Sequence, residues 1–299
     1  MLGLSGGIDS VALLHILVHL RKEGQQDFHI SALHVHHGIS QFADEWDDFC
    51  HDACRQMGVA YSCARVAVER SSKDGFEAAA RRVRHEVFAA ACADWLMLAH
   101  HRDDQAETLL FNLLRGSGIA GVAAMREQNG QLLRPLLTVS RGEIEQYAQL
   151  HQLEWREDES NADTRYSRNF LRRNIIPALT HRFPATAKNL AAAAGRFAEA
   201  HEMLNELAIA DLGDAPAEFP LSLQKLRTLS EVRARNVLRY LLAGEKVQIP
   251  SEARLREALR QMLAADADRH PALVFGRQRL LRRRDWIYLE PVGACADKR

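Results

Sequence analysis

Short apolar runs alternate with amphipathic stretches of helical length in the N-terminal part of the chain, and this alternation constrains the fold more than any other feature. The predicted strands cover residues 1–4, 29–35, 60–68 and 95–99. The predicted helices between them cover residues 10–22, 44–57 and 77–92. Such alternation is typical of an α/β fold with a doubly wound parallel sheet, which gathers ligand-binding groups at the carboxyl ends of its strands.

A turn rich in serine and glycine lies between the first predicted strand and the first predicted helix. Its members are Ser5, Gly6, Gly7, Ile8, Asp9 and Ser10. Adjacent glycines allow backbone N–H groups to converge on an anion, and the N-terminus of the next helix favours negative charge. A carboxylate at Asp9 beside a phosphate indicates a cation between them, which we expect to be Mg²⁺. A plain helix N-cap without a ligand is the alternative for this turn.

The composition excludes several classes of protein. The 299 residues are 47% hydrophobic and carry no formal net charge, which favours globular domains over a generally basic nucleic-acid coat. No apolar run reaches the roughly 18 residues of a membrane helix, so we expect a cytoplasmic protein without a membrane partner. The five cysteines include no C-x-x-C pair, and we expect Cys50 and Cys54 to be buried free thiols. The absence of a G-x-x-x-x-G-K-[ST] sequence argues against a loop that transfers a terminal phosphate.

A change in composition near residue 184 predicts a second domain. Residues 1–183 then form the α/β domain, and residues 184–299 form a smaller, mainly helical domain. The helices predicted for this second domain cover residues 185–210, 230–243 and 251–264. A predicted hairpin of residues 272–275 and 280–289 closes it and carries a cluster of arginines.

Acidic residues gather where a predicted helix follows the fourth strand. Asp103 or Asp104 would cap this helix, with Glu107 completing a capping box. Three acids are more than a cap requires, and Asp104 and Glu107 are spaced to share one helix face. We therefore expect this pair to hold an ammonium group or a Mg²⁺ ion at the active edge of the sheet.

Arginines and glycines provide further candidates. Arg81 would neutralise phosphate charge if its helix faces the nucleotide, whereas an exposed, salt-bridged helix is the alternative. Arg115 begins a segment that contains Gly116, Gly118 and Gly121, which predicts a flexible loop or the close approach of a ligand, although a C-cap alone would explain Gly116.

Two other clusters of polar residues have a structural explanation as well as a functional one. The histidines at positions 34, 36 and 37 end the second strand, and we interpret them as a polar pocket wall rather than a metal site, because strand geometry splits them between two faces. Charge clusters are more often solvated faces than binding sites, yet arginine patches on a neutral chain indicate local attraction for phosphate. The first patch contains Arg165, Arg168, Arg172, Arg173 and Arg182.

The ordered set of these motifs resembles the tRNA(Ile)-lysidine synthase family of the PP-loop ATP pyrophosphatase superfamily. The matching segments span about residues 1–180 and are far more specific together than any one alone. They are residues 5–10, His34–Gly38, Glu77–Arg81 with Arg84, His101 with Asp104, Glu107 and Thr108, Arg115–Gly121 with Met125, the Arg-Pro-Leu-Leu sequence from Arg134, residues 157–161, and Arg168–Arg172 with Pro177.

The resemblance implies an ATP-dependent ligase that forms a C–N bond. ATP with Mg²⁺ first adenylates the C2 oxygen of the wobble cytidine in the CAU anticodon of an isoleucine tRNA. L-Lysine then displaces AMP through its amine to give lysidine. The cytidine must leave its stack to reach such a site.

The resemblance also assigns roles to residues. Residues 5–10 and His101 would bind ATP, Asp9 would help to hold Mg²⁺, and Arg81 would be the electrophilic partner of the phosphates. Asp104 and Glu107 would bind the lysine ammonium group. The contacts to tRNA or nucleotide would come from Arg115, Arg165, Arg168, Asn169, Arg172 and Arg173, with Arg282, Arg283 and Arg284 as further candidates.

The chain departs from the family pattern in several places. Glu159 stands where many members have proline, and we expect a truncated first strand and the absence of a further C-terminal domain that grips the tRNA acceptor end. A PP-loop tRNA thiolase is the alternative enzyme, although thiolases of the cytidine-modifying kind use paired cysteines, and a non-enzymatic binding module is the alternative class. The sequence leaves the choice between a monomer and a homodimer open.

Overall fold

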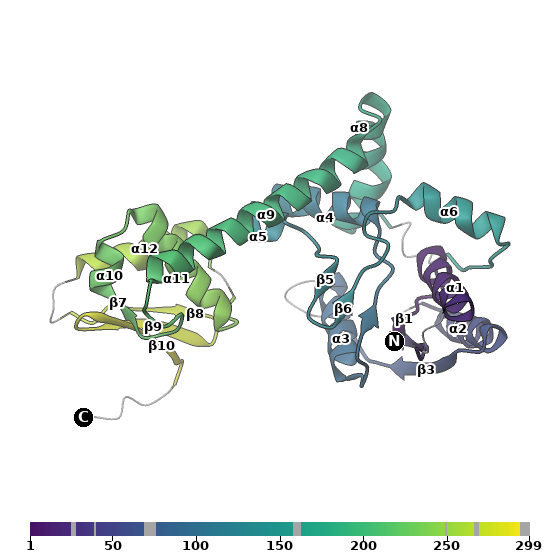
Figure 1. Ribbon diagram of the computed structural model, residues 1–299, viewed down its shortest axis with the longest axis horizontal. Helices are drawn as coiled ribbons and strands as arrows, with labels where there is room; N and C mark the ends of the chain where they lie inside the picture. Colours follow the sequence, from purple (N-terminus) through teal and green to yellow (C-terminus); the bar gives the residue numbers. More distant parts are fainter. Residues whose placement is uncertain are drawn as a thin grey trace. The chain divides into compact units, whose positions relative to one another are not determined.

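The protein divides into two compact units, Met1–Ala198 and Glu199–Arg299, which are drawn in Figure 1. A computed structural model describes residues 1–24, 28–38, 40–68, 76–157, 163–248, 250–265 and 269–293. Helix α9 (Thr186–Leu212) crosses the division between the units, so the domain boundary at residue 184 stays a prediction.

A six-stranded sheet forms the centre of the first unit, in the order β3-β2-β1-β4-β6-β5. Its strands are β1 (Leu2–Gly3), β2 (Ser31–His36), β3 (Ala60–Arg65), β4 (Leu96–Met97), β5 (Gln128–Asn129) and β6 (Leu132–Leu133). All neighbouring pairs are parallel except β5 with β6. The predicted parallel sheet is confirmed, and the central position of β1 brings the ends of β1, β2 and β4 to one edge.

Helices follow the strands as the alternation predicts. In the first unit they are α1 (Ile8–Glu23), α2 (Ala43–Met57), α3 (Phe76–Ala90), α4 (Arg102–Leu114), α5 (Ile119–Val122), α6 (Arg141–Leu150), α7 (Ser167–Phe170) and α8 (Ile176–Arg182). A π-helical turn, η2 (Leu171–Ile175), joins α7 to α8. The core packs apolar residues of α1, such as Leu13 and Leu14, against Ile144 and Ala148 of α6; α1 is apolar on most sides because it is buried on most sides. Cys50 and Cys54 are buried free thiols, as predicted.

The second unit places helices on one face of a four-stranded antiparallel sheet (Figure 1). Its helices are α10 (Leu223–Arg227), α11 (Glu231–Gly244) and α12 (Glu252–Ala264). Its strands, in sheet order, are β7 (Leu221–Ser222), β10 (Trp286–Pro291), β9 (Gln278–Arg283) and β8 (Ala272–Phe275). The core includes Leu238, Leu255, Leu280 and Ile287, all fully buried.

The predicted hairpin in this unit is partly wrong. The expected single strand over residues 280–289 is two strands, β9 and β10, because a turn at Arg284 has a positive φ of 54° and reverses the chain. Arg282 was a candidate contact for RNA, but its side chain is 3% exposed. It donates hydrogen bonds to the carbonyls of Met262, Ala265 and Arg284, so its role is structural.

Candidate active site

The serine- and glycine-rich turn forms a closed set of hydrogen bonds at the N-terminus of α1. The Ser10 hydroxyl donates to the Gly7 carbonyl at 2.9 Å and accepts from the Ser5 N–H at 3.2 Å. Gly6 has a φ of +83°, and a side chain there would lie 3.2 Å from Cys50 Sγ. Since the first N–H groups of a helix have no acceptor within it, this turn presents donors suited to an anion.

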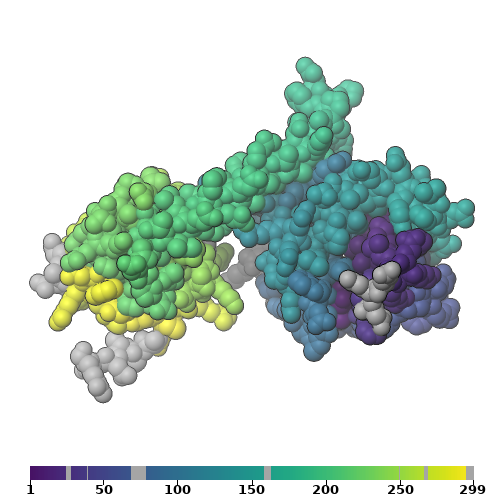
Figure 2. Space-filling view, viewed as in Figure 1, coloured from purple at the N-terminus to yellow at the C-terminus, as the bar shows by residue number. Residues whose placement is uncertain are grey.

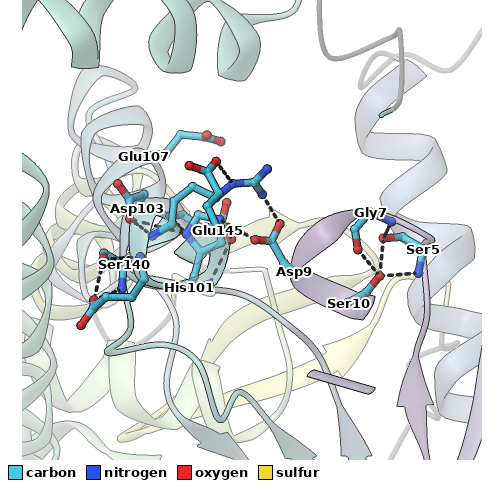
Figure 3. Close-up of polar contacts among 12 residues, drawn as sticks. Ser5, Gly7, Asp9, Ser10, His101, Asp103, Glu107, Ser140 and Glu145 are labelled. Atoms are coloured by element: carbon cyan, nitrogen blue, oxygen red, sulfur yellow. Dashed lines mark hydrogen bonds and ion pairs between the residues drawn. The ribbon is translucent and has the colours of Figure 1, made fainter. Parts of the chain in front are cut away.

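Asp9 projects from the first turn of α1 into a network of charged side chains, drawn in Figure 3. Its Oδ2 atom accepts a hydrogen bond from Arg141 Nη1 at 2.5 Å. Its Oδ1 atom lies 3.7 Å from His101 Nε2 and is buried, with no hydrogen-bond donor among the described residues. Burial raises the pKa of Asp9, and the neighbouring His101 and Arg141 side chains oppose that shift.

His101 connects Asp9 to the acids that open α4. The His101 N–H donates to Asp104 Oδ2 at 3.1 Å, and His101 Nδ1 accepts from the Asp104 N–H at 3.4 Å. This reciprocal pair caps the helix, so the expectation of an aspartate cap completed by Glu107 is wrong. Glu107 is thereby left for other contacts, and Asp103 accepts from the Arg141 N–H at 2.9 Å.

Two arginines from η2 and α7 contact the acidic pair. Arg172 Nη2 lies 2.8 Å from Asp104 Oδ1, and Arg172 Nε lies 2.8 Å from Glu107 Oε2. Arg168 Nη1 lies 3.2 Å from Glu107 Oε1 and 3.3 Å from Thr108 Oγ1. Glu107 is only 3% exposed, and burial raises the pKa of its carboxyl group. The guanidinium groups of Arg172 and Arg168 oppose that shift. The acids predicted to hold an ammonium group therefore hold a guanidinium group here.

Arg81 acts on the same region through its charge. Burial lowers the pKa of His100 to about 3; the negative charge of Asp104 opposes this shift, and the positive charges of Arg134, Arg81 and Arg84 add to it. Arg134 donates from Nε to His100 Nδ1 at 3.3 Å and from Nη1 to the carbonyl of Arg126 at 2.7 Å. The charge of Arg81 therefore contributes to the lowered pKa of the histidine that precedes His101.

The segment before residue 158 is attached to the turn at residues 5–10. The Arg156 N–H donates to the Gly6 carbonyl at 2.9 Å, and the Arg156 guanidinium lies 4.5 Å from the centre of the Phe49 ring. The Asp-Glu-Ser-Asn sequence noted above begins at 158 and lies outside the described residues, so its role stays a prediction.

The glycine-containing segment after α4 forms a turn and the short helix α5, and Asn112 Nδ2 donates to the Gly121 carbonyl at 2.7 Å. The predicted flexibility of this segment, or close approach of a ligand to it, stays a prediction. A side chain at Gly121 would lie 2.8 Å from Ser117 Cβ, which explains this glycine by close packing. Arg115 lies over the Phe111 ring at 5.2 Å, and Arg168 lies over the same ring at 5.1 Å.

The other predicted substrate contacts have different surroundings. Arg165 is exposed and pairs with Asp163 at 2.7 Å, while Asn169 Nδ2 donates to the Asp163 carbonyl at 3.0 Å. Arg173 is exposed on η2. His34 and His36 lie in β2 and His37 follows it, and their role as a pocket wall stays a prediction. Among them, His34 lies 2.9 Å through Nδ1 from the Leu4 carbonyl.

Sequence reasoning missed Arg141, which pairs with Asp9 and, at 2.9 Å, with Glu145. A signal was present, because Ser140 and Glu143 form a capping box that marks residue 141 as the first residue of a helix. A positive side chain is unfavourable at that end of the helix dipole, so arginine there indicates a nearby anion.

The sequence of the chain matches two families of known proteins. Residues 1–179 match the PP-loop domain family, and residues 221–288 match the family described as the TilS substrate binding domain. The chain belongs to the PP-loop family. It is 45% identical over 247 residues to the tRNA(Ile)-lysidine synthase of Nitrosomonas europaea, and the aligned region covers 80% of this chain and 54% of that protein. It is 41% identical over 295 residues to that of Alkalilimnicola ehrlichii, covering 97% of this chain and 66% of that protein.

The chain spans between about half and two thirds of the length of these relatives. A U34-tRNA thiolase, NcsA from Methanococcus maripaludis, solved with its [4Fe-4S] cluster, aligns with a TM-score of 0.54 at 18% identity, covering 66% of this chain and 70% of that one. That likeness shows the α/β fold alone. None of the helices within the described residues is both long and apolar enough to span a membrane.

Proposed function

We propose that this chain carries the catalytic centre of a tRNA(Ile)-lysidine synthase, which uses ATP to activate a cytidine of tRNA and then joins L-lysine to it. One observation carries the proposal: Asp9 of the turn at residues 5–10 is linked through His101 to Asp104, and Arg172 links Asp104 to Glu107. A site for a triphosphate thus lies beside a site for a cationic amine. The sequence relatives named above support the same reaction.

The first step is adenylation. The C2 oxygen of the wobble cytidine attacks the α-phosphorus of ATP, and the bond to pyrophosphate breaks. The N–H groups at the start of α1 bind the phosphate oxygens, and Arg81 and Arg141 supply positive charge as the leaving group gains negative charge.

The residues present fit the Mg²⁺ ion that the family implies. Mg²⁺ is commonly bound by one or two carboxylates together with substrate phosphates. Asp9 Oδ1 has no hydrogen-bond donor among the described residues, so it would be the protein ligand. Bound there, Mg²⁺ would neutralise phosphate oxygens as pyrophosphate leaves.

The second step is the attack of lysine on C2 of the adenylated base. The lysine amine forms a bond to C2, the bond from C2 to the AMP oxygen breaks, and the amine loses a proton. Asp104 and Glu107 bind an ammonium group of lysine and position it. Since Arg172 pairs with both acids, lysine must replace or share these contacts.

A decisive experiment measures pyrophosphate release from ATP with isoleucine tRNA carrying the CAU anticodon, with and without lysine. Release that requires the tRNA, together with lysine incorporation, supports the proposal. Asp9→Asn should abolish most of this release, whereas the control Asp52→Asn alters a half-exposed carboxylate on α2 that pairs with Arg55. Release that ignores both the tRNA and Asp9→Asn would refute the proposal.

A further inference from the structure

The peptide unit between Gly6 and Gly7 has two accessible orientations with opposite consequences for an anion. Gly6 has a φ of +83° and Gly7 a φ of −75°. Turning this peptide over would give Gly7 a positive φ, which glycine tolerates. Because a trans peptide is planar, its carbonyl and its N–H point to opposite sides. One orientation therefore presents the Gly7 N–H to an anion, and the other presents the Gly6 carbonyl, which repels an anion.

In the structure the Gly7 N–H faces the side of the turn that carries the serine hydroxyls. It donates to Ser5 Oγ at 3.4 Å, and Ser5 Oγ lies 3.1 Å from Ser10 Oγ, as the grouping of these residues in Figure 3 shows. A donor-to-acceptor distance of 3.4 Å is long for this bond, so an anion can replace the hydroxyl as acceptor. The Gly6 carbonyl points the other way and accepts the Arg156 N–H at 2.9 Å.

The segment that carries Arg156 is anchored in the core of the first unit. Leu153 and Trp155 pack against that core, and the Leu153 N–H donates to a carbonyl of α6 at 2.9 Å. Figure 2 shows α6, in teal, beside α1, in purple, at the surface of this unit. The Arg156 guanidinium lies 4.5 Å from the centre of the Phe49 ring, and a side chain at Gly6 would touch the same ring. The donor is thus held in place before a ligand binds.

The group of Arg156 that reaches the turn is its main-chain N–H. Among the described residues, its guanidinium contacts the Phe49 ring on α2 and the Trp155 carbonyl, the latter at 3.4 Å, and forms no ion pair. The N–H bond to Gly6 is shorter and is made directly to the peptide that faces the ligand. A role through the backbone therefore fits these contacts better than a role through charge.

We propose that the Arg156 N–H selects the anion-binding orientation of the Gly6–Gly7 peptide, which makes Arg156 a positioning residue for the phosphates of ATP. The inference rests on the proposed function for the identity of the anion. The bond acts on the turn and not on the reacting atoms. An N–H group at position 156 is required, whereas the arginine side chain is not.

The test measures pyrophosphate binding to the full chain by isothermal titration calorimetry. Arg156→Pro removes the donor and should weaken the affinity about 2- to 12-fold, the effect of one lost hydrogen bond. Arg156→Gln keeps the N–H but removes the charge, and it should bind pyrophosphate nearly as tightly as the wild type. Glu154→Pro is the matched control, because the Glu154 N–H makes no hydrogen bond among the described residues of the same segment.

A second measurement uses the wild type and does not depend on the folding of a proline variant. Coupling between two sites is reciprocal, so bound pyrophosphate should slow hydrogen exchange of the Arg156 amide by the factor of affinity that Arg156→Pro loses. The Leu153 amide, whose acceptor lies in α6, is the reference and should change less.

Equal affinity of Arg156→Pro and the wild type, or unchanged exchange at Arg156, would overturn the inference. So would an equal loss in Arg156→Gln and Arg156→Pro, which would identify the guanidinium as the phosphate contact. A wild type that binds no pyrophosphate would refute both the role of the turn and this inference. If pyrophosphate release ignores tRNA while Arg156→Pro alone weakens pyrophosphate binding, the proposed function fails and the inference stands.

Discussion

Replacing Glu107 with glutamine should separate lysine binding from both ATP use and stability. The carboxylate is nearly buried and contacts Arg172 and Arg168, and its Oε2 atom is one of the two groups offered to the lysine ammonium. A hydrogen bond to a charged group contributes about 1.5–3 kcal/mol, so Glu107→Gln should raise the KM for lysine about 10- to 150-fold. The KM for ATP should change little, because the described ion pairs of Glu107 are with Arg168 and Arg172 and none is with the turn at residues 5–10.

The stability of this variant provides an independent check. Burial raises the pKa of Glu107 despite two guanidinium neighbours, so the ionised carboxylate is held at a cost in free energy. The neutral amide removes that cost, while Arg172 keeps its contact with Asp104 and is half exposed. The free energy of unfolding in urea should therefore stay within about 1 kcal/mol of the wild type or rise.

The assay combines lysine incorporation into tRNA with pyrophosphate release at varied lysine and ATP. Glu231→Gln is the control, because it changes an exposed helical glutamate that pairs with Arg235 at 2.8 Å. A variant whose KM for ATP rises while its KM for lysine is unchanged would refute the assignment of Glu107 to lysine.

Three further predictions concern the same site. Because the pKa of Glu107 is raised, this carboxylate gains a proton on acidification at a higher pH than an exposed glutamate; the KM for lysine should rise there, and Glu107→Gln should lack that rise. Arg141→Ala should lower kcat/KM for ATP about tenfold or more, because Asp9 loses the hydrogen bond from Arg141. Equal pyrophosphate release by the variant and the wild type would contradict this prediction. Gly6→Ala should raise the KM for ATP, because it places a side chain beside Cys50 on a backbone with a φ of +83°. Gly58→Ala, at a φ of +64° with open space around it, should lower only the stability. Kinetic and unfolding measurements on both variants test this difference.

Local patterns predicted the elements that surround the site. Strands β1 to β4 and the helices α1, α2 and α3 between them were found from the alternation of apolar and amphipathic segments, whereas the short strands β5 and β6 were not predicted. The glycines at positions 6 and 7 marked the turn predicted to bind an anion, because a glycine affects the backbone conformation only within a few residues of itself. Such features depend on neighbours in the sequence, so the sequence carries them.

The partners of the charged side chains were decided only by tertiary structure. Asp9 and Arg141 are 132 residues apart, and Arg172 lies 65 residues after the Glu107 that it contacts. The same limit applies to Arg282 and Arg283, which are adjacent and identical in type, yet Arg282 is buried against the end of α12 and Arg283 is exposed. Sequence by itself determined the α/β fold and the position of the serine- and glycine-rich turn before α1. Packing determined which charge meets which, because long-range pairing depends on how elements come together and leaves little trace in local pattern.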